Sequence, residues 1–304
     1  MEEAETSARD EAQNALSRGL IRLALFLPYR LRVPFVGKIV SYIVAPYAGW
    51  SKRVGDHLSH AMPDLSERER RRIIRGVTDN VGRTLIEVYS GEEFIDRIRA
   101  SELEGPGIAD LEQARNEGRP IILVTAHLGN YDVVRGKLSR EGYPIGALYR
   151  PMDNAAFNTH YVDAISAIAT PVFPTTPRGL TRLLRHLKEG GVIGILADVA
   201  STRAPLLSFF GKPAHTPLST AEWAIKYGAV FVPVFGIRKK DGLGFRIRIE
   251  TPLLQADPEE MMQAYNDLVE TTVLNHPEQW FWVHRRWKLS PEAQKAVNAG
   301  ELPR

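Results

Sequence analysis

The sequence predicts an α/β protein, with a mostly parallel central sheet flanked by helices behind an N-terminal helical region. Short apolar runs such as "IILVTA" and "VIGILAD" are typical of strands that are buried on both faces. Segments of helical length separate these runs, and strands that alternate with helices favour parallel pairing. With 304 residues, 44% of them hydrophobic and 25% charged, the chain has the composition of a folded globular protein.

The first well-marked element is a helix over residues 66–89. It opens with Ser66 followed three positions later by Glu69, which is a capping-box pattern. Apolar residues then recur at helical spacing, at Ile73, Ile74, Val77, Val81, Leu85 and Val88. The pattern predicts one buried face, with the "RERRR" run on the solvated side.

Strands and helices alternate after residue 107. "GIADLEQARN", "VVRGKLSREG", "NAAFNTHYVDAISAIA", "PRGLTRLLRHLKEGG" and "TAEWAIKYGA" read as helices between strands. "VFVPVFGIRK" and "FRIRIE" read as further strands, and we expect an antiparallel pair late in the chain. We therefore divide the chain into an N-terminal helical region (1–105), an α/β domain (106–290) and a C-terminal tail (291–304).

The N-terminal region concentrates positive charge next to apolar residues. Residues 12–55 hold no Asp or Glu and seven Lys or Arg, and since the whole chain carries +3, the remainder carries −4. The apolar runs "LIRLALFL" and "VPFVGKIVSYIVAPYAGW" are broken by proline and lysine before they reach the ~18–20 residues of a spanning helix. We expect this segment to lie on an anionic membrane surface. The alternative is a set of core helices whose basic side chains reach solvent. The acidic start "MEEAETSARDEAQN" argues against a secretory signal.

The strongest candidate for catalysis follows the strand 121–126. In "TAHLGNYD", His127 precedes Asp132 by five positions, which on a regular helix would point the two side chains apart. Gly129 and Asn130 favour a turn that would bring them together. Asp132 would then accept a hydrogen bond from His127 and orient it as a general base. The alternative is a buried histidine with a structural carboxylate partner.

The same segment, taken with others, resembles a known family. "TAHLGNYD" is similar to the H-x4-D/E signature of the glycerolipid acyltransferase superfamily. "ALYRPMDN", "LADVASTRAPLLSFFGKPAHTPLSTAEWAIKYGAVFVPVF" and "HPEQWFWVHRRWK" resemble one branch of it, the late acyltransferases of lipid A biosynthesis, which transfer lauroyl or myristoyl groups. The resemblance covers about residues 15–288. The ordered set of segments is far more specific than the H-x4-D motif alone.

The resemblance implies a role for each matching residue. His127 would be the general base on a lipid hydroxyl and Asp132 its orienting partner, with Asn130 between them in contact with substrate. Arg150 would bind an anionic headgroup or carrier phosphate, although a surface ion pair would also explain it. Asp198 matches an acidic position near the family's active site, or else serves the structure. "SFFG" (Phe209, Phe210, Gly211) would line the acyl or acceptor channel, or pack in an aromatic core, and "VHRRWK" would contact phosphate or membrane, or be a solvated chain end.

The chain departs from the lipid A branch at positions that concern the acceptor. The branch has aromatic residues around the histidine and a glutamate at the acid position, where this chain has Leu128, Tyr131 and Asp132. Val199 replaces a glutamine that usually follows the acid of "LAD". The acceptor could therefore be lipid A-like, a mycobacterial-type mannoside or a bacterial aminolipid that carries a hydroxyacyl chain.

The expected partners follow from this resemblance and from what the sequence lacks. G-x-G-x-x-G and Walker patterns are absent, so a nucleotide would enter only as the CoA part of a donor. We expect no metal, because a thioester is already activated and His127 can handle the proton, and no nucleic acid as a partner. Acyl-CoA or acyl carrier protein would be the co-substrate, and the protein would sit peripherally on the cytoplasmic face of a bacterial inner membrane. Two other functions compete with acyl transfer: an acyl-thioester hydrolase, and a non-catalytic lipid-binding or tethering protein. The absence of a G-x-S-x-G motif from the sequence argues against a hydrolase of the serine-esterase type.

Overall fold

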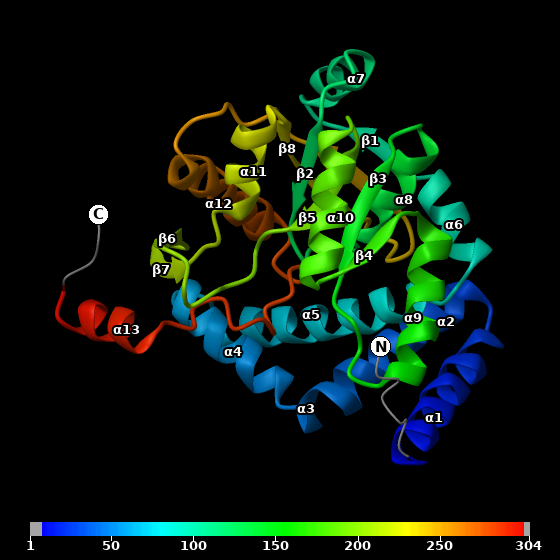
Figure 1. The fold of residues 1–304 in the computed structure, drawn as a ribbon. Coiled ribbons are helices and arrows are strands. Elements are labelled where there is room, and N and C mark those ends of the chain that lie inside the picture. The colour runs from blue at the N-terminus through cyan, green and yellow to red at the C-terminus, as the bar shows by residue number, and fades with distance from the viewer. Residues whose placement is uncertain (1–7, 301–304) are drawn as a thin grey trace.

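The fold is built on a seven-stranded sheet, seen in a computed structural model that describes residues 8–300 (Figure 1). The strand order is β1-β9-β8-β2-β5-β3-β4. Every neighbouring pair is parallel except β8 and β9, which run antiparallel, so the expected late antiparallel pair is confirmed. The strands are β1 (Glu102–Glu104), β2 (Ile121–Thr125), β3 (Ile145–Tyr149), β4 (Val172–Pro174), β5 (Val192–Leu196), β8 (Val230–Arg238) and β9 (Phe245–Ile249), beside a separate hairpin of β6 (Leu206–Phe209) and β7 (Lys212–His215).

Helices cover both faces of the sheet, and a further group lies across one end of it (Figure 1). The first group comprises α6 (Glu92–Arg99), α7 (Ile108–Asn116), α8 (Asp132–Arg140), α9 (Ala155–Ile168), α10 (Pro177–Lys188), α11 (Ser219–Tyr227) and α12 (Pro258–Asn275). The second comprises α1 (Ala8–Leu25), α2 (Tyr29–Ile39), the π-helix η1 (Val40–Val44), α3 (Ala45–Tyr47), α4 (Trp50–Ala61) and α5 (Glu67–Val88). Helix α13 (Pro291–Asn298) lies within the predicted C-terminal tail.

Alternation along the strands explains why the sheet has two cores. In β2, Ile122 and Val124 join one buried cluster, whereas Ile121 and Leu123 join another. Successive side chains of a strand point to opposite faces, so a strand covered on both faces has to be apolar throughout. All five residues of β2 are buried, as the continuous run "IILVT" predicts.

The N-terminal helices are joined to this core by α5. Its capping box is present, since the Ser66 hydroxyl accepts a hydrogen bond from the Glu69 N–H and the Glu69 carboxylate accepts one from the Ser66 N–H. Val77 of α5 belongs to the same buried cluster as Ile122 of β2. Strand β1 precedes residue 105 yet pairs with β9. The sheet and its core therefore both include residues from the N-terminal side of the boundary drawn at 105.

Exposed apolar side chains concentrate on the N-terminal helices. Of the fifteen large exposed hydrophobic residues in the described part of the chain, ten lie between residues 16 and 47. They are Leu16, Leu20, Leu23, Phe26, Leu31, Phe35, Tyr42, Ile43, Val44 and Tyr47. A concentration of exposed apolar side chains is typical of surfaces that contact a partner or a membrane. Within residues 8–300, no helix has both the length and the hydropathy to span a bilayer.

Candidate active site

His127 lies on a tight loop just beyond the carboxyl end of β2. Its carbonyl accepts a hydrogen bond from the Phe281 N–H at 2.8 Å, and the Gly129 N–H donates to the Gln279 carbonyl at 3.0 Å. Gly129 has a φ of +60°, and an added Cβ would stand 2.0 Å from the Gly236 carbonyl oxygen. Only glycine fits this close approach in a left-handed conformation. The turn predicted at "GN" is present, and it fixes the backbone on both sides of His127.

Asp198 is the hydrogen-bond partner of His127. Both oxygens of its carboxylate take part in hydrogen bonds. Oδ1 is 2.7 Å from His127 Nδ1, and Oδ2 accepts hydrogen bonds from the His127 backbone N–H and the Trp280 indole N–H, each at 2.8 Å. Asp198 is 1% exposed. Strands β2 and β5 pair in parallel with Thr125 opposite Leu196, so the second residue after each strand reaches the same edge of the sheet. The topology thus brings His127 and Asp198 together.

The electrostatics of the pair set the tautomer of the imidazole. Burial raises the pKa of Asp198, but His127 and its two hydrogen bonds, together with the nearby His284, outweigh that effect and hold this pKa below its usual range. An ionised carboxylate only accepts hydrogen bonds, so Nδ1 of His127 carries the proton. Nε2 is left with a free lone pair, as a general base requires.

A second histidine, His284, lies against His127 and was not singled out by its sequence. The two ring centroids are 4.4 Å apart and the rings meet edge to face. Its Nε2 is buried and has no hydrogen-bond partner among the described residues. Burial lowers the pKa of His284 to about 4, with the neighbouring His127 acting in the same direction. The "VHRRWK" segment therefore supplies a neutral polar group to this site. The feature of the sequence that could have indicated His284 is its position within a tryptophan-rich run.

This buried neutral histidine predicts a pH-dependent stability. The unfolded chain protonates His284 near pH 6.5, whereas the folded protein does so near 4, so the unfolded state binds more protons between these values. Lowering the pH from 7 to 4 should cost about 3 kcal/mol from this residue. Urea unfolding of the wild type and of His284→Asn across that range measures the difference. If the unfolding free energies of the two proteins changed with pH in the same way, His284 would not be the source of the pH dependence.

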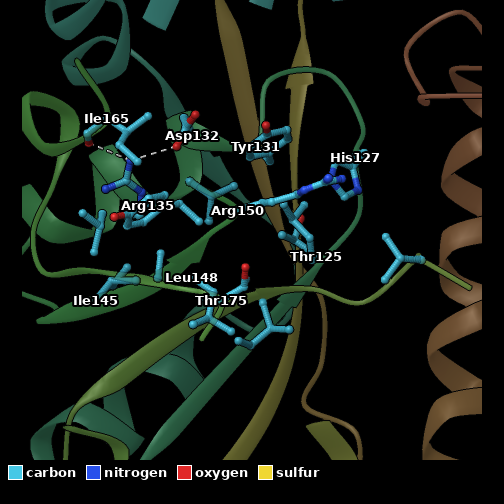
Figure 2. Close-up of a pocket in the computed structure, with 18 of the residues that line it drawn as sticks. Thr125, His127, Tyr131, Asp132, Arg135, Ile145, Leu148, Arg150, Ile165 and Thr175 are labelled. Atoms are coloured by element: carbon cyan, nitrogen blue, oxygen red, sulfur yellow. Dashed lines mark hydrogen bonds and ion pairs between the residues drawn. The ribbon is translucent and has the colours of Figure 1, made fainter. Parts of the chain in front are cut away.

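Asp132, expected to orient His127, has a different partner. Its Oδ1 accepts a hydrogen bond from Arg135 Nη2 at 2.9 Å, and the same nitrogen donates to the Ile165 carbonyl at 2.9 Å. Both side chains are at least nine-tenths buried. Figure 2 shows this pair set apart from His127, and within residues 8–300 no hydrogen bond joins Asp132 to His127. The five-residue spacing makes Asp132 the first residue of α8, whose next turn provides Arg135.

Asn130, expected to contact substrate, is fully buried. Its amide nitrogen donates to Glu87 Oε2 at 2.8 Å, and its oxygen accepts the Asp132 N–H at 3.1 Å. Glu87 in turn forms a two-pronged ion pair with Arg238, at 2.5 and 2.8 Å. Asn130 therefore anchors the His127 loop to a buried charge network. The sequence did carry a signal for this network. Glu87 follows Ile73 and Asn80 at seven-residue spacing, which places a charged residue on the apolar face of the helix.

A cavity of about 930 Å³ opens beside His127. Its walls come from β2, β3 and β5, from α8 and α9, and from the segment that carries Phe281 and His284 (Figure 2). Most of the lining is apolar, including Leu123, Ile145 and Ile165, while the buried hydroxyl of Thr125 has no hydrogen-bond partner in the described part of the chain. Arg150 lines the cavity at the carboxyl end of β3, and its side chain is 83% exposed, with a 3.8 Å contact to Asp153. The cavity suits a long apolar group with a polar end near His127.

The "SFFG" residues lie outside this lining. Phe209 ends β6, and Phe210 and Gly211 form the two-residue turn to β7, with φ of 53° and 63°. Phe209 is 1% exposed and packs on Trp280, with a ring separation of 5.5 Å. Arg286 stacks over Phe209 at 4.8 Å. Phe209 thus lies in an aromatic core, which is the alternative given above for this motif, while Gly211 is exposed at the turn.

Histidine pairs elsewhere in the described residues show no metal geometry. His57 and His60 pack edge to face against Trp287, and His57 Nδ1 is 2.7 Å from the Trp282 carbonyl. Within residues 8–300, no group of three or more His, Asp or Glu side chains is placed to hold a metal ion.

Comparisons with other proteins find relatives that match most of this chain. The chain is 27% identical over 288 residues to the lipid A biosynthesis lauroyltransferase of Escherichia coli (strain K12), covering 91% of this chain and 92% of that protein. It is 24% identical to the lipid A biosynthesis palmitoleoyltransferase of the same organism, with 92% of each covered. The phosphatidylinositol mannoside acyltransferase of Mycobacterium tuberculosis (strain CDC 1551 / Oshkosh) is 23% identical, covering 69% of this chain and 68% of that protein.

A family profile gives the wider match. The profile of the bacterial lipid A biosynthesis acyltransferases aligns with residues 5–289, which include the His127 loop, the cavity walls and the tryptophan-rich segment. The chain is thus a lipid acyltransferase that belongs to the bacterial lipid A biosynthesis acyltransferase family.

Proposed function

We propose that this protein transfers a fatty acyl group from a thioester donor, acyl-CoA or acyl carrier protein, to a hydroxyl of a membrane lipid. The observation that carries the proposal is the His127–Asp198 pair at an apolar cavity, with the histidine Nδ1 2.7 Å from a carboxylate that is 1% exposed. The acceptor is a lyso-lipid or a hydroxyacylated lipid, either lipid A-like or a bacterial aminolipid. Similarity to both lipid A and mannoside acyltransferases supports a membrane lipid as the acceptor.

The chemistry follows from the tautomer. Nε2 of His127 accepts the proton of the acceptor hydroxyl as its oxygen attacks the thioester carbonyl, and Asp198 stabilises the positive imidazolium. The C–S bond then breaks, and the leaving thiolate takes the proton from Nε2. The ester forms, the thiol is released and His127 returns to its starting state. No group beyond the two substrates has to supply atoms or electrons.

The apolar wall predicts a selection by acyl length. Gly194 in β5 lines the cavity, and a Cβ added there would meet Ile145 Cγ2 at 3.6 Å, an ordinary contact. Gly194→Leu should therefore fold but fill part of the cavity, so the preferred acyl chain should become shorter by several carbons. Competition among acyl-CoA donors of graded length measures the shift. An equal loss of activity with every donor length would argue against an acyl site here.

The exposed apolar residues predict membrane binding through the N-terminal helices. Leu23 and Phe26 are 67% and 86% exposed, and each apolar side chain buried in a lipid interface contributes about 1.5 kcal/mol or more. Leu23→Ser/Phe26→Ser should lower partitioning into anionic vesicles at least about tenfold, and added salt should weaken binding of the wild type. Of the seven basic residues, Arg32 is buried against Glu93 and the carbonyls of Leu25 and Leu27 and contributes nothing to this attraction.

A matched control for the membrane prediction uses exposed leucines outside the N-terminal helices. Leu254 and Leu274 are 86% and 55% exposed, and Leu254→Ser/Leu274→Ser should float with vesicles as the wild type does. If the two double variants lost binding equally, the N-terminal helices would not be the membrane contact.

One reaction tests the function and separates it from its rivals. Purified protein, a labelled acyl thioester and a bacterial lyso-lipid extract should form a heavier, acylated lipid, and His127→Ala should abolish that product while vesicle binding persists. Free fatty acid as the sole product would identify a hydrolase. Lipid binding with no thioester consumption would identify a tethering protein, and full activity of His127→Ala would overturn the assigned base.

A further inference from the structure

The exposed face of α10 carries an uncompensated row of positive charge. Arg178, Arg182, Arg185 and Lys188 are all exposed, while Gly179, Leu183 and Leu187 of the same helix are buried. Within residues 8–300 none of the four forms an ion pair, and only Arg182 has a ring contact, over Phe173 at 5.1 Å. At 1.5 Å of rise per residue, the row extends about 15 Å. We call these four residues the α10 ridge.

The ridge begins at the cavity that holds His127. Thr175 lines the cavity, and Thr176 caps the first turn of α10 by accepting the Gly179 N–H. The neighbouring strand β3 ends at Tyr149, whose carbonyl accepts the Thr175 N–H at 2.9 Å. Arg150 therefore follows β3 at the same edge of the sheet at which α10 starts. A line of cations runs from the cavity mouth along the outside of the molecule.

We infer that the α10 ridge docks an acidic acyl carrier protein, the donor that would deliver its thioester to His127. This deepens the proposed function and rests on it. A carrier protein has to place the end of a flexible arm in the cavity while its own body stays outside. Rows of unpaired charge beside a cavity mouth suit this task, because they speed encounter with an acidic partner and set its orientation.

The composition of the ridge favours a soluble protein over a lipid surface. The large apolar side chains that are exposed on the N-terminal helices have no counterpart here, since every leucine of α10 is buried or partly buried. The acid that follows, Glu189, stands beyond the last turn, so the charge of the ridge is not cancelled along its length. A membrane contact would combine cations with exposed apolar groups, as residues 16–47 do.

Two donors that carry the same acyl chain test the inference. Arg178→Glu/Arg185→Glu should raise KM for acyl carrier protein about tenfold or more with little change in kcat, and leave KM for acyl-CoA within about twofold. The wild-type KM for the carrier should rise with salt more steeply than that of the variant. As a matched control, Lys226→Glu/Lys240→Glu makes the same change in charge at exposed sites on α11 and in the turn between β8 and β9, away from the strands β3, β4 and β5 that α10 packs against, and should leave both KM values unchanged.

Each other outcome is decisive. An unchanged KM for the carrier, or an equal loss with both donors, would overturn carrier docking while leaving acyl transfer in place. A loss of vesicle binding in the ridge variant would assign α10 to the membrane instead. If the wild-type protein transferred an acyl group from neither donor, the proposed function itself would be rejected.

Discussion

Replacing Asp198 by asparagine is expected to lower kcat by about 10³ to 10⁴-fold with little change in thermal stability. The amide oxygen of asparagine would take over the hydrogen bonds from the His127 backbone N–H and from Trp280, which leaves its NH₂ facing Nδ1 of His127. The imidazole proton would then move to Nε2, and the nitrogen that has to accept the substrate proton would be blocked. Steady-state kinetics with a fixed acyl donor, together with a melting curve, measures the effect.

The matched control is Asp132→Asn, which tests the partner that the sequence suggested. Asp132 is paired with Arg135, so this change should lower stability, because it weakens a buried ion pair. Asp132→Asn/Arg135→Met removes both charges and should recover part of that loss. A larger fall in kcat for Asp132→Asn than for Asp198→Asn, at equal thermal stability, would return the orienting role to Asp132.

Arg238→Met is expected to cost about 3 to 5 kcal/mol of unfolding free energy. Glu87 is 0% exposed and would be left as a buried carboxylate without its cation. Activity should fall as well, because the network holds the His127 loop: Arg238 donates to Asn80, Asn80 donates to the Gly129 carbonyl, and Asn130 donates to Glu87. Urea unfolding followed by circular dichroism gives the free energy.

A second variant distinguishes the buried charge from simple loss of packing. Glu87→Gln/Arg238→Met removes both charges and should be more stable than Arg238→Met alone. Lys52→Ala breaks the exposed pair with Asp56 and should change the unfolding free energy by under about 0.5 kcal/mol. If the double variant were the less stable of the two, the cost of an unpaired buried Glu87 would not be the cause.

The architecture was predictable because it rests on local patterns. Continuous apolar runs marked β2 and β5 as strands buried on both faces, and the Ser66 capping box marked the start of α5. The location of His127 followed as well, since residues just beyond the carboxyl ends of parallel strands gather at one edge. What local patterns could not provide was the N-terminal boundary, because β1 pairs with a strand that lies more than 140 residues later in the chain.

By itself, the sequence determined the α/β class, the family signature and the histidine at the end of β2. Only the tertiary structure decided which carboxylate that histidine meets. Asp132 is close in sequence but begins a helix that supplies its own arginine, whereas Asp198 is 71 residues away and reaches His127 because β2 and β5 are neighbours. Which carboxylate pairs with His127 depends on the order of the strands in the sheet and on the position of the Arg135 side chain, which pairs with Asp132. These are properties of the packed chain, and no spacing within the H-x4-D motif encodes them.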